Sequence, residues 1–279
     1  MISFAINHVT IANSGFRELV ALSADLGCVG VEVRNDLAGT LFDGIEPPVV
    51  RQLLNDKRQR LLALAELVAF NDFSDQKLAE AVDLCAIATD FGAEAVSLIP
   101  RNDGHDLDLK TRTANLKLAL RELKPVFEQA GLTAFVEPLG FESSSIRYKH
   151  EVVSAIEALD ASGTYKLVHD TFHHCLADEK TFFPGHTGIV HVSGVSNTSR
   201  PVTELLDEDR VLVSTGDRLG NIEQLEALHS AGYAGPVSFE VFAPEVHALA
   251  RPFNSINNSM EHIASVIRRS TIENVPAWH

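Results

Sequence analysis

Short apolar runs alternate with longer amphipathic segments along almost the whole chain. The runs have the length of buried strands, while the segments between them show helical spacing of apolar residues, and several end at glycines. Strands that alternate with helices form parallel sheets, and eight strand–helix units can close into a barrel. The eight runs lie at 2–6, 29–34, 61–67, 95–99, 132–136, 166–170, 188–191 and 236–239. We therefore predict an α/β fold with a single (β/α)8 TIM-barrel domain over residues 1–279, whose last helix and C-terminal tail occupy 254–279.

An open doubly wound sheet is the alternative arrangement of such units. That fold would need a glycine-rich turn between the first strand and the first helix, whereas residues 7–16 include a single glycine, Gly15. The length of 279 residues also suits a barrel, which typically takes about 250. The pattern therefore favours the barrel. The connection at 194–221 is long for a loop between a strand and a helix, and it predicts a lid over a ligand site.

Four consecutive strands, the fifth to the eighth, end in a side chain that can bind a metal ion. These side chains are Glu137, Asp170, His191 and Glu240. The C-terminal strand ends of a barrel meet at one face, where the active site lies. Carboxylates that converge there repel one another unless a cation neutralises them, although each residue alone could be a solvated loop residue. The pattern predicts one divalent metal ion, for which we favour Zn²⁺ or Mn²⁺, with Mg²⁺ and Co²⁺ as alternatives.

Two polar residues beyond the strand ends each have two interpretations. His173 follows Asp170 by three residues and could donate a hydrogen bond to a polarised substrate oxygen. It could instead face solvent at the start of a helix. Arg210 follows the acidic run at 204–209 and could reach a substrate hydroxyl from the lid. It could equally pair with those acids at the surface, where ion pairs contribute little.

Three more titratable residues lie on or near the strands. Glu32 and Glu66 could support the site or contact a substrate hydroxyl, but each could also simply pair with Arg34. His169 lies next to Asp170, and side chains alternate along a strand, so we expect it to point at the helices. There it would be a hydrogen-bonded packing residue rather than a metal ligand.

Composition and charge argue against several classes of partner. The formal net charge of −15 opposes binding to a phosphate backbone or to an anionic membrane surface. Three cysteines, widely spaced and odd in number, predict no disulfide framework and fit a reducing compartment. The N-terminal residues show no basic stretch and no long apolar core. We expect a cytoplasmic protein whose partner is a small molecule and neither a nucleic acid nor a membrane. The sequence leaves both a monomer and a homo-oligomer open.

The strand-end residues also resemble those of a known superfamily. Glu137, the segment Asp170-Thr-Phe-His173, His191 and the segment from Glu240 to Glu245 resemble the xylose-isomerase-like barrels of sugar isomerases and epimerases. Among these they resemble the 2-keto-myo-inositol (inosose) isomerases most. Further matches are Asn7 and the segments 31–34, 71–72 and 207–210.

This resemblance implies a division of labour among the site residues. Glu137, Asp170, His191 and Glu240 would bind one divalent metal ion. Glu137 and Glu240 would double as the acid and the base, and His173 would contact the substrate. The resemblance and the positions of the residues together make His173, Arg210, Asn7 and Glu66 the predicted substrate-binding residues.

The predicted function is a metal-dependent isomerase of a sugar or cyclitol ketone, acting by proton transfer through an enediolate, as in myo-inositol catabolism. Removing a proton next to a carbonyl needs a base and a Lewis acid. An epimerase or an inosose-type dehydratase would begin with the same step. An AP endonuclease would need more histidines and a basic face. A sugar-binding protein without catalysis is the alternative from another class, and the intact pair Glu137 and Glu240 argues against it.

Overall fold

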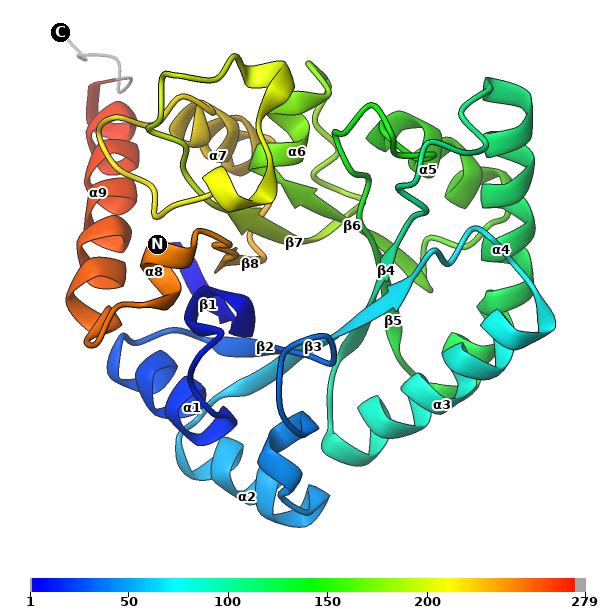
Figure 1. Cartoon of the computed structure of the whole chain (residues 1–279), viewed down its shortest axis with the longest axis horizontal. Helices are drawn as coiled ribbons and strands as arrows, with labels where there is room; N and C mark the ends of the chain where they lie inside the picture. Colours follow the sequence, from blue (N-terminus) through cyan, green and yellow to red (C-terminus); the bar gives the residue numbers. More distant parts are fainter. Residues whose placement is uncertain (1, 274–279) are drawn as a thin grey trace, which may run out of the picture.

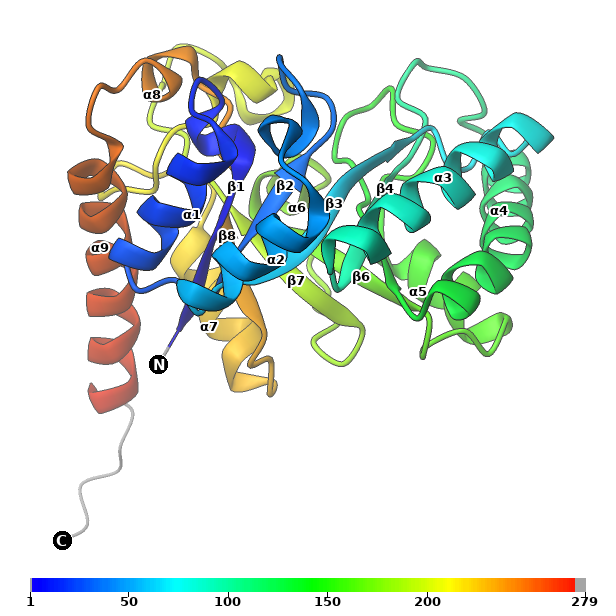
Figure 2. The ribbon, with the colours of Figure 1, turned by 90° about the horizontal axis from the view of Figure 1, so that it is seen from below.

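A closed barrel of eight parallel strands forms the centre of the computed structural model, which describes residues 2–273 (Figures 1 and 2). The strands follow one another around the barrel in chain order, and β8 pairs with β1 to close it. Each of the eight predicted runs lies within one residue of an observed strand, so the prediction of a TIM barrel is confirmed. The strands are β1 Ser3–Asn7, β2 Gly30–Arg34, β3 Arg60–Val68, β4 Ala95–Ile99, β5 Thr133–Val136, β6 Tyr165–Asp170, β7 Thr187–Val192 and β8 Pro236–Phe239.

Helices surround the strands on the outside of the barrel (Figure 1). Their ends follow local capping chemistry: the Ser74 side chain accepts from Lys77 N at the start of α3, and Gly92 ends that helix with φ of +80°. The helices are α1 Phe16–Asp25, α2 Pro47–Asp56, α3 Asp75–Phe91, α4 Leu109–Ala130, α5 Lys149–Ala158, α6 Thr171–Leu176, α7 Asn221–Ser230, α8 Pro244–His247 and α9 Pro252–Glu273. Helix α9 covers most of the predicted last helix and tail, and residues 274–279 lie outside the described part of the chain.

The inside of the barrel holds a small apolar cluster of its own, separate from the larger core that includes the helices. Side chains alternate along a strand, so the inward positions two residues after Phe135, Val168 and Ile189 belong to Glu137, Asp170 and His191. The polar strand ends therefore lie directly above an apolar layer. That layer consists of Ala5, Leu62, Ala63, Ala95, Phe135, Val168 and Ile189.

The long connection between β7 and α7 is folded onto the barrel. It contains two short 3-10 turns, Val202–Glu204 and Asp207–Asp209, and an antiparallel bridge joins Gly194 to Val211. Apolar residues of this connection pack against α6 in a cluster that includes Val195, Leu205, Leu219, Phe172 and Leu176. This packing fixes the connection next to the strand ends.

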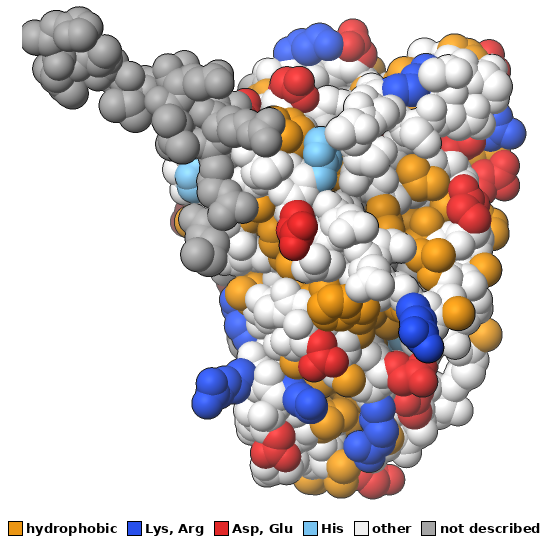
Figure 3. Space-filling view, turned by 90° about the vertical axis from the view of Figure 1, so that its left-hand side faces the viewer, with side chains coloured by type: hydrophobic (Ala, Val, Ile, Leu, Met, Phe, Trp, Pro, Cys, Tyr) orange, Lys and Arg blue, Asp and Glu red, His pale blue; other side chains and the backbone are white. Residues whose placement is uncertain are grey.

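On the described part of the face in Figure 3, acidic and basic side chains are interspersed and form no continuous basic stripe. Among the described helices, none has both the length and the apolar character needed to span a bilayer.

Candidate metal centre

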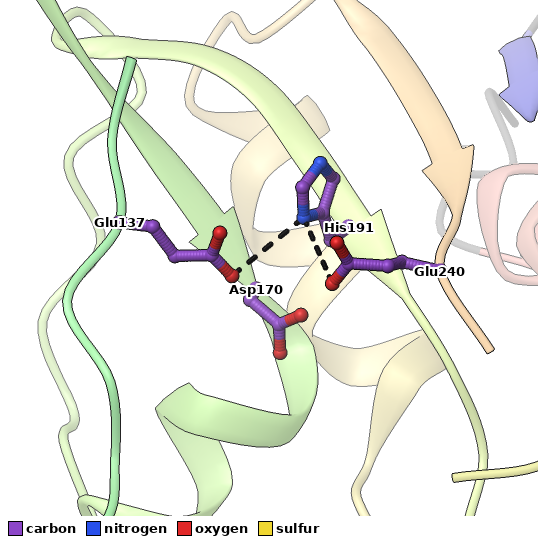
Figure 4. Close-up of side chains that lie close together, drawn as sticks. All are labelled: Glu137, Asp170, His191 and Glu240. Carbon is purple, nitrogen blue, oxygen red and sulfur yellow. Dashed lines mark ion pairs between the residues drawn. The ribbon is translucent and has the colours of Figure 1, made fainter. Parts of the chain in front are cut away.

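The four predicted metal ligands lie together at the C-terminal ends of β5 to β8. One ligand atom from each of Glu137, Asp170, His191 and Glu240 lies within 4.8 Å of the others. Figure 4 shows their side chains pointing toward one another. All four residues are at most 4% exposed. Buried carboxylates at this spacing are costly without a neutralising cation.

Strand register and a helix start explain why these side chains converge. Asp170 and His191 are paired neighbours on β6 and β7, so they point the same way. Asp170 also caps helix α6, because its Oδ1 accepts from the backbone N–H of His173 at 2.9 Å. This bond fixes one carboxylate oxygen and leaves Oδ2 on the side of the other ligands.

The carboxylate of Glu32 orients the imidazole ring of His191. Nε2 of this ring lies 3.1 Å from Glu32 Oε2, where the ring N–H donates and the carboxylate oxygen accepts. The other ring nitrogen, Nδ1, is buried without a hydrogen-bond partner and faces Glu240 Oε2 at 3.2 Å and Glu137 Oε1 at 3.6 Å. Metal-binding histidines usually have such a carboxylate on the second nitrogen. Three carboxylates and an unpartnered imidazole nitrogen therefore fit a divalent metal ion.

Glu240 is surrounded by donors. Its Oε1 accepts from Asn7 Nδ2 at 3.1 Å and from Arg34 Nη1 at 3.2 Å. Its Oε2 accepts from Arg210 Nη2 at 2.9 Å and faces His191. Burial alone would raise the pKa of Glu240, but His191 and the two arginines outweigh it and lower the pKa well below its ordinary value. Glu240 is therefore held in the ionised form.

Glu137 lies in the opposite electrostatic environment. Within the described residues, His191 is the one cationic group that reaches its carboxylate. Burial, followed by the negative charge of Glu240, raises the pKa of Glu137 to about 7. The same carboxylates raise the pKa of His191 well above its ordinary value, against the effect of burial. Before a metal ion binds, the cluster thus combines one ionised glutamate with one that titrates near neutral pH.

Arg210 lies inside the site, so surface pairing with the acidic run does not describe it. The residue is 1% exposed, and its Nη2 donates to Asp170 Oδ2 at 2.5 Å as well as to Glu240. Its Nη1 contacts one member of the acidic run, Asp207, at 3.2 Å. The guanidinium also contacts two aromatic rings, 4.9 Å from that of Phe172 and 4.7 Å from that of Phe242.

His173 is buried next to the cluster and does not face solvent. It is 4% exposed, and its Nδ1 has no hydrogen-bond partner in the described part of the chain. Burial lowers its pKa, so the ring is neutral and offers one donor and one acceptor. The rings of Phe141 and Phe172 pack edge-on against it, with centroids 5.1 and 5.2 Å away.

A small cavity of about 150 Å³ opens above the cluster. Of the predicted substrate-binding residues, His173, Arg210 and Glu66 line this cavity. Asn7 does not line the cavity: it is fully buried and contacts Glu240. Its contact with a substrate stays a prediction. The lining residues are Arg34, Glu66, Ile99, Asn102, Glu137, Leu139, Phe141, His173, Asp207, Arg210, Glu240 and Phe242.

The structure shows that Glu66 and Glu32, for which the sequence left two interpretations open, have different partners. Glu66 pairs with Arg34 at 3.0 Å, whereas Glu32 hydrogen-bonds to His191 and supports the cluster. His169 is fully buried and contacts Gln224 Oε1 at 3.0 Å, which confirms a hydrogen-bonded packing residue. Arg34 was not predicted to belong to the site. Alternation along β2 would have found it, because it lies two residues after the inward-pointing Glu32.

Known proteins share this architecture. A xylose isomerase domain-containing protein from Salmonella typhimurium LT2 is 27% identical, with a TM-score of 0.86 over 95% of this chain and 97% of that one. The IolI protein, solved with a zinc atom, is 20% identical, with a TM-score of 0.85 over 95% and 99%. L-ribulose 3-epimerase is 16% identical, with a TM-score of 0.71 over the full length of both chains. Among curated proteins, none matches the chain in sequence.

A family model covers far more of the sequence than any single motif does. The model described as the xylose isomerase-like TIM barrel matches residues 20–269, which include all four residues of the cluster. This match agrees with the barrel topology and with the resemblance at the strand ends. The chain belongs to the xylose isomerase-like TIM barrel family.

Proposed function

We propose that the chain is a divalent-metal-dependent isomerase of a small sugar or cyclitol ketone, such as 2-keto-myo-inositol. The observation that supports this proposal best is the convergence of two buried glutamates with Asp170 and His191 at the base of one cavity. Before a metal ion binds, Glu240 is kept ionised and the pKa of Glu137 is raised to about 7. Moving a carbonyl along an α-hydroxy ketone requires one group that removes a proton and another that returns one.

The four clustered residues would hold the metal ion. A zinc or manganese ion fits the donor set best, and the zinc atom of the similar IolI protein supports zinc. When bound, the ion would supply a Lewis acid that stabilises negative charge on the substrate oxygens. Within this site, Glu240 would accept the proton from carbon, and Glu137 would return a proton to the neighbouring position.

The remaining cavity residues would bind and orient the substrate. His173 is neutral and would donate a hydrogen bond to a substrate oxygen, and Glu66 would accept one from a hydroxyl. Arg210 would hold Glu240 and Asp170 in place, since its guanidinium contacts both. The rings of Phe141 and Phe242 line the cavity and would limit the access of water to a charged intermediate.

Metal analysis combined with a panel of ketones tests this proposal. Purified protein should contain about one equivalent of metal ion, and metal-replete protein should convert at least one inosose or ketose into an isomer of the same mass. A product that differs only in configuration at one carbon would indicate an epimerase, and loss of water would indicate a dehydratase. Absence of a bound metal ion together with absence of conversion would refute the proposal.

A further inference from the structure

Arg34 lies at the end of β2 and contacts the oxygen of Glu240 that Arg210 does not contact. It is 8% exposed, and its guanidinium contacts the carboxylates of Asp36, Glu66 and Glu240. Nη1 donates to Glu240 Oε1 at 3.2 Å, and Nη2 donates to Glu66 Oε2 at 3.0 Å. The guanidinium of Arg34 thus connects Glu240, one of the four clustered residues, with Glu66, which lines the cavity.

The orientation of this guanidinium is fixed from two sides. Asp36 binds it in a bidentate manner, with Nε to Oδ1 at 2.8 Å and Nη2 to Oδ2 at 2.7 Å. The ring of Phe242 lies 5.6 Å from the guanidinium carbon. Bidentate pairing with a carboxylate restricts a guanidinium more than a single ion pair does. Arg34 therefore presents its Nη1 edge to Glu240 in one direction only.

This arrangement assigns different tasks to the two oxygens of Glu240. Oε1 is held by Arg34 and Asn7, and Oε2 is left toward His191 and Arg210. Without Arg34, Oε1 would keep only the contact with Asn7, and the carboxylate would be held less firmly in this orientation. The guanidinium also separates the negative charges of Glu240 and Glu66, which would otherwise repel across the cavity wall.

Glu66 is oriented by the same contact. Its Oε2 accepts from Arg34, and in the described structure no side chain donates to Oε1. The residue lines the cavity above the cluster and is partly exposed there. A substrate hydroxyl that donates to Oε1 would therefore meet an acceptor whose position depends on Arg34.

We propose that Arg34 is a positioning residue that couples Glu240, the carboxylate assigned to proton transfer, to Glu66, the carboxylate assigned to substrate recognition. The proposal rests on the function proposed above. Arg34 would keep Oε2 of Glu240 directed toward the other three clustered residues. It would keep Oε1 of Glu66 directed toward the substrate. None of the four clustered residues lies on β2.

The test compares Arg34→Met and Arg34→Lys with Arg101→Met and Arg101→Lys. Arg101 is a matched control because it follows β4, pairs with Asp72, Asp103 and Asp106, and contacts none of the four clustered residues. Loss of an outer contact of a metal ligand typically weakens metal affinity or activity by about 10–100-fold. Arg34→Met should therefore raise the metal Kd by about tenfold and lower kcat by about 100-fold. Both Arg101 variants should stay within about threefold of wild type.

Two further measurements separate positioning from general stability. Arg34→Lys keeps the charge without the bidentate geometry, so it should fold like wild type and recover metal affinity more than kcat. In a Glu66→Gln background, Arg34→Met should change KM less than it does in wild type, because the two residues act on one substrate contact. Equal effects of the Arg34 and Arg101 variants, or additive KM changes, would overturn the proposal. If wild-type protein converts no ketone, the proposed function fails, while the metal Kd values still decide whether Arg34 positions Glu240.

Discussion

Glu137 and Glu240 face the same cluster, yet their surroundings differ at the level of single hydrogen bonds. Guanidinium and amide donors contact both oxygens of Glu240, whereas Glu137 faces only the His191 imidazole among the described cationic groups. Both carboxylates are buried, so the donors decide which one stays ionised. The proposed division into a base and an acid follows from this difference.

Replacing Glu137 by Gln should change how stability depends on pH in metal-free protein. The pKa of Glu137 is about 7 in the folded state and about 4.3 in the unfolded state. At pH values between these two, the folded state binds more protons than the unfolded state. Stability from this group is therefore lost as pH rises through that window. Glu137→Gln should remove this loss, which is on the order of 3 kcal/mol. Chelator-treated protein unfolded in urea at pH 5 and pH 8 gives the measurement, and an unchanged difference between the two pH values would contradict the assignment.

Replacing Asp170 by Asn should weaken metal binding without unfolding the barrel. An amide oxygen is a poorer ligand than a carboxylate for a divalent ion, and Asn still caps a helix start. The metal Kd should rise at least about tenfold, which corresponds to ~1.4 kcal/mol. Asp207→Asn is the control, because Asp207 lines the cavity but is not one of the four clustered residues. Titration calorimetry that finds equal Kd values for both variants would remove Asp170 from the ligand set.

The connection between β7 and α7 depends on one aspartate. Asp217 accepts hydrogen bonds from the backbone N–H groups of Val195 and Leu219 through Oδ1 and from that of Asn221 through Oδ2. These bonds join the two ends of the connection from which Arg210 reaches the cluster. Asp217 thus holds the two ends of the connection, and Arg210 lies in its middle part.

Asp217→Ala should loosen this connection while the barrel stays folded. Hydrogen bonds to charged groups contribute about 1.5–3 kcal/mol, so amide hydrogen exchange over 195–219 should become about 10–100-fold faster. Asp178→Asn is the control, since Asn tolerates the left-handed backbone of residue 178 and Lys180 is the ion-pair partner of this exposed side chain among the described residues. We also expect a bound ketone to slow exchange in this connection in wild-type protein. Exchange that neither the substitution nor a ligand changes would exclude a lid.

Local sequence signals predicted the regular elements but not the irregular ones. Ser74 and Gly92 mark the ends of α3 by capping chemistry, which depends only on neighbouring residues. Helix α8 and the 3-10 turns after β7 have too few residues for a periodic pattern. Their positions depend on tertiary contacts, such as the burial of Leu205 against α6. No rule that reads neighbouring residues contains that information.

At the scale of the whole molecule, parallel strands in chain order bring distant residues to one face. That rule was enough to predict the convergence of Glu137, Asp170, His191 and Glu240, whose ligand atoms lie within 4.8 Å of one another. It could not predict which donors surround each carboxylate. The buried position of Arg210, for example, depends on how a long connection folds back and brings its guanidinium into contact with two aromatic rings.

Turnover in heavy water tests the central claim, metal-dependent proton transfer next to a carbonyl, most directly. Metal-loaded protein should convert a suitable inosose or ketose and place solvent deuterium on the carbon beside the carbonyl, as seen by NMR and mass spectrometry. Chelator-treated protein should do neither, and Glu240→Gln should lower kcat by about 10²–10⁴-fold while substrate affinity changes little. Metal-replete wild type that binds one of these ketones tightly, yet leaves every one of them unlabelled and unconverted, would contradict the account.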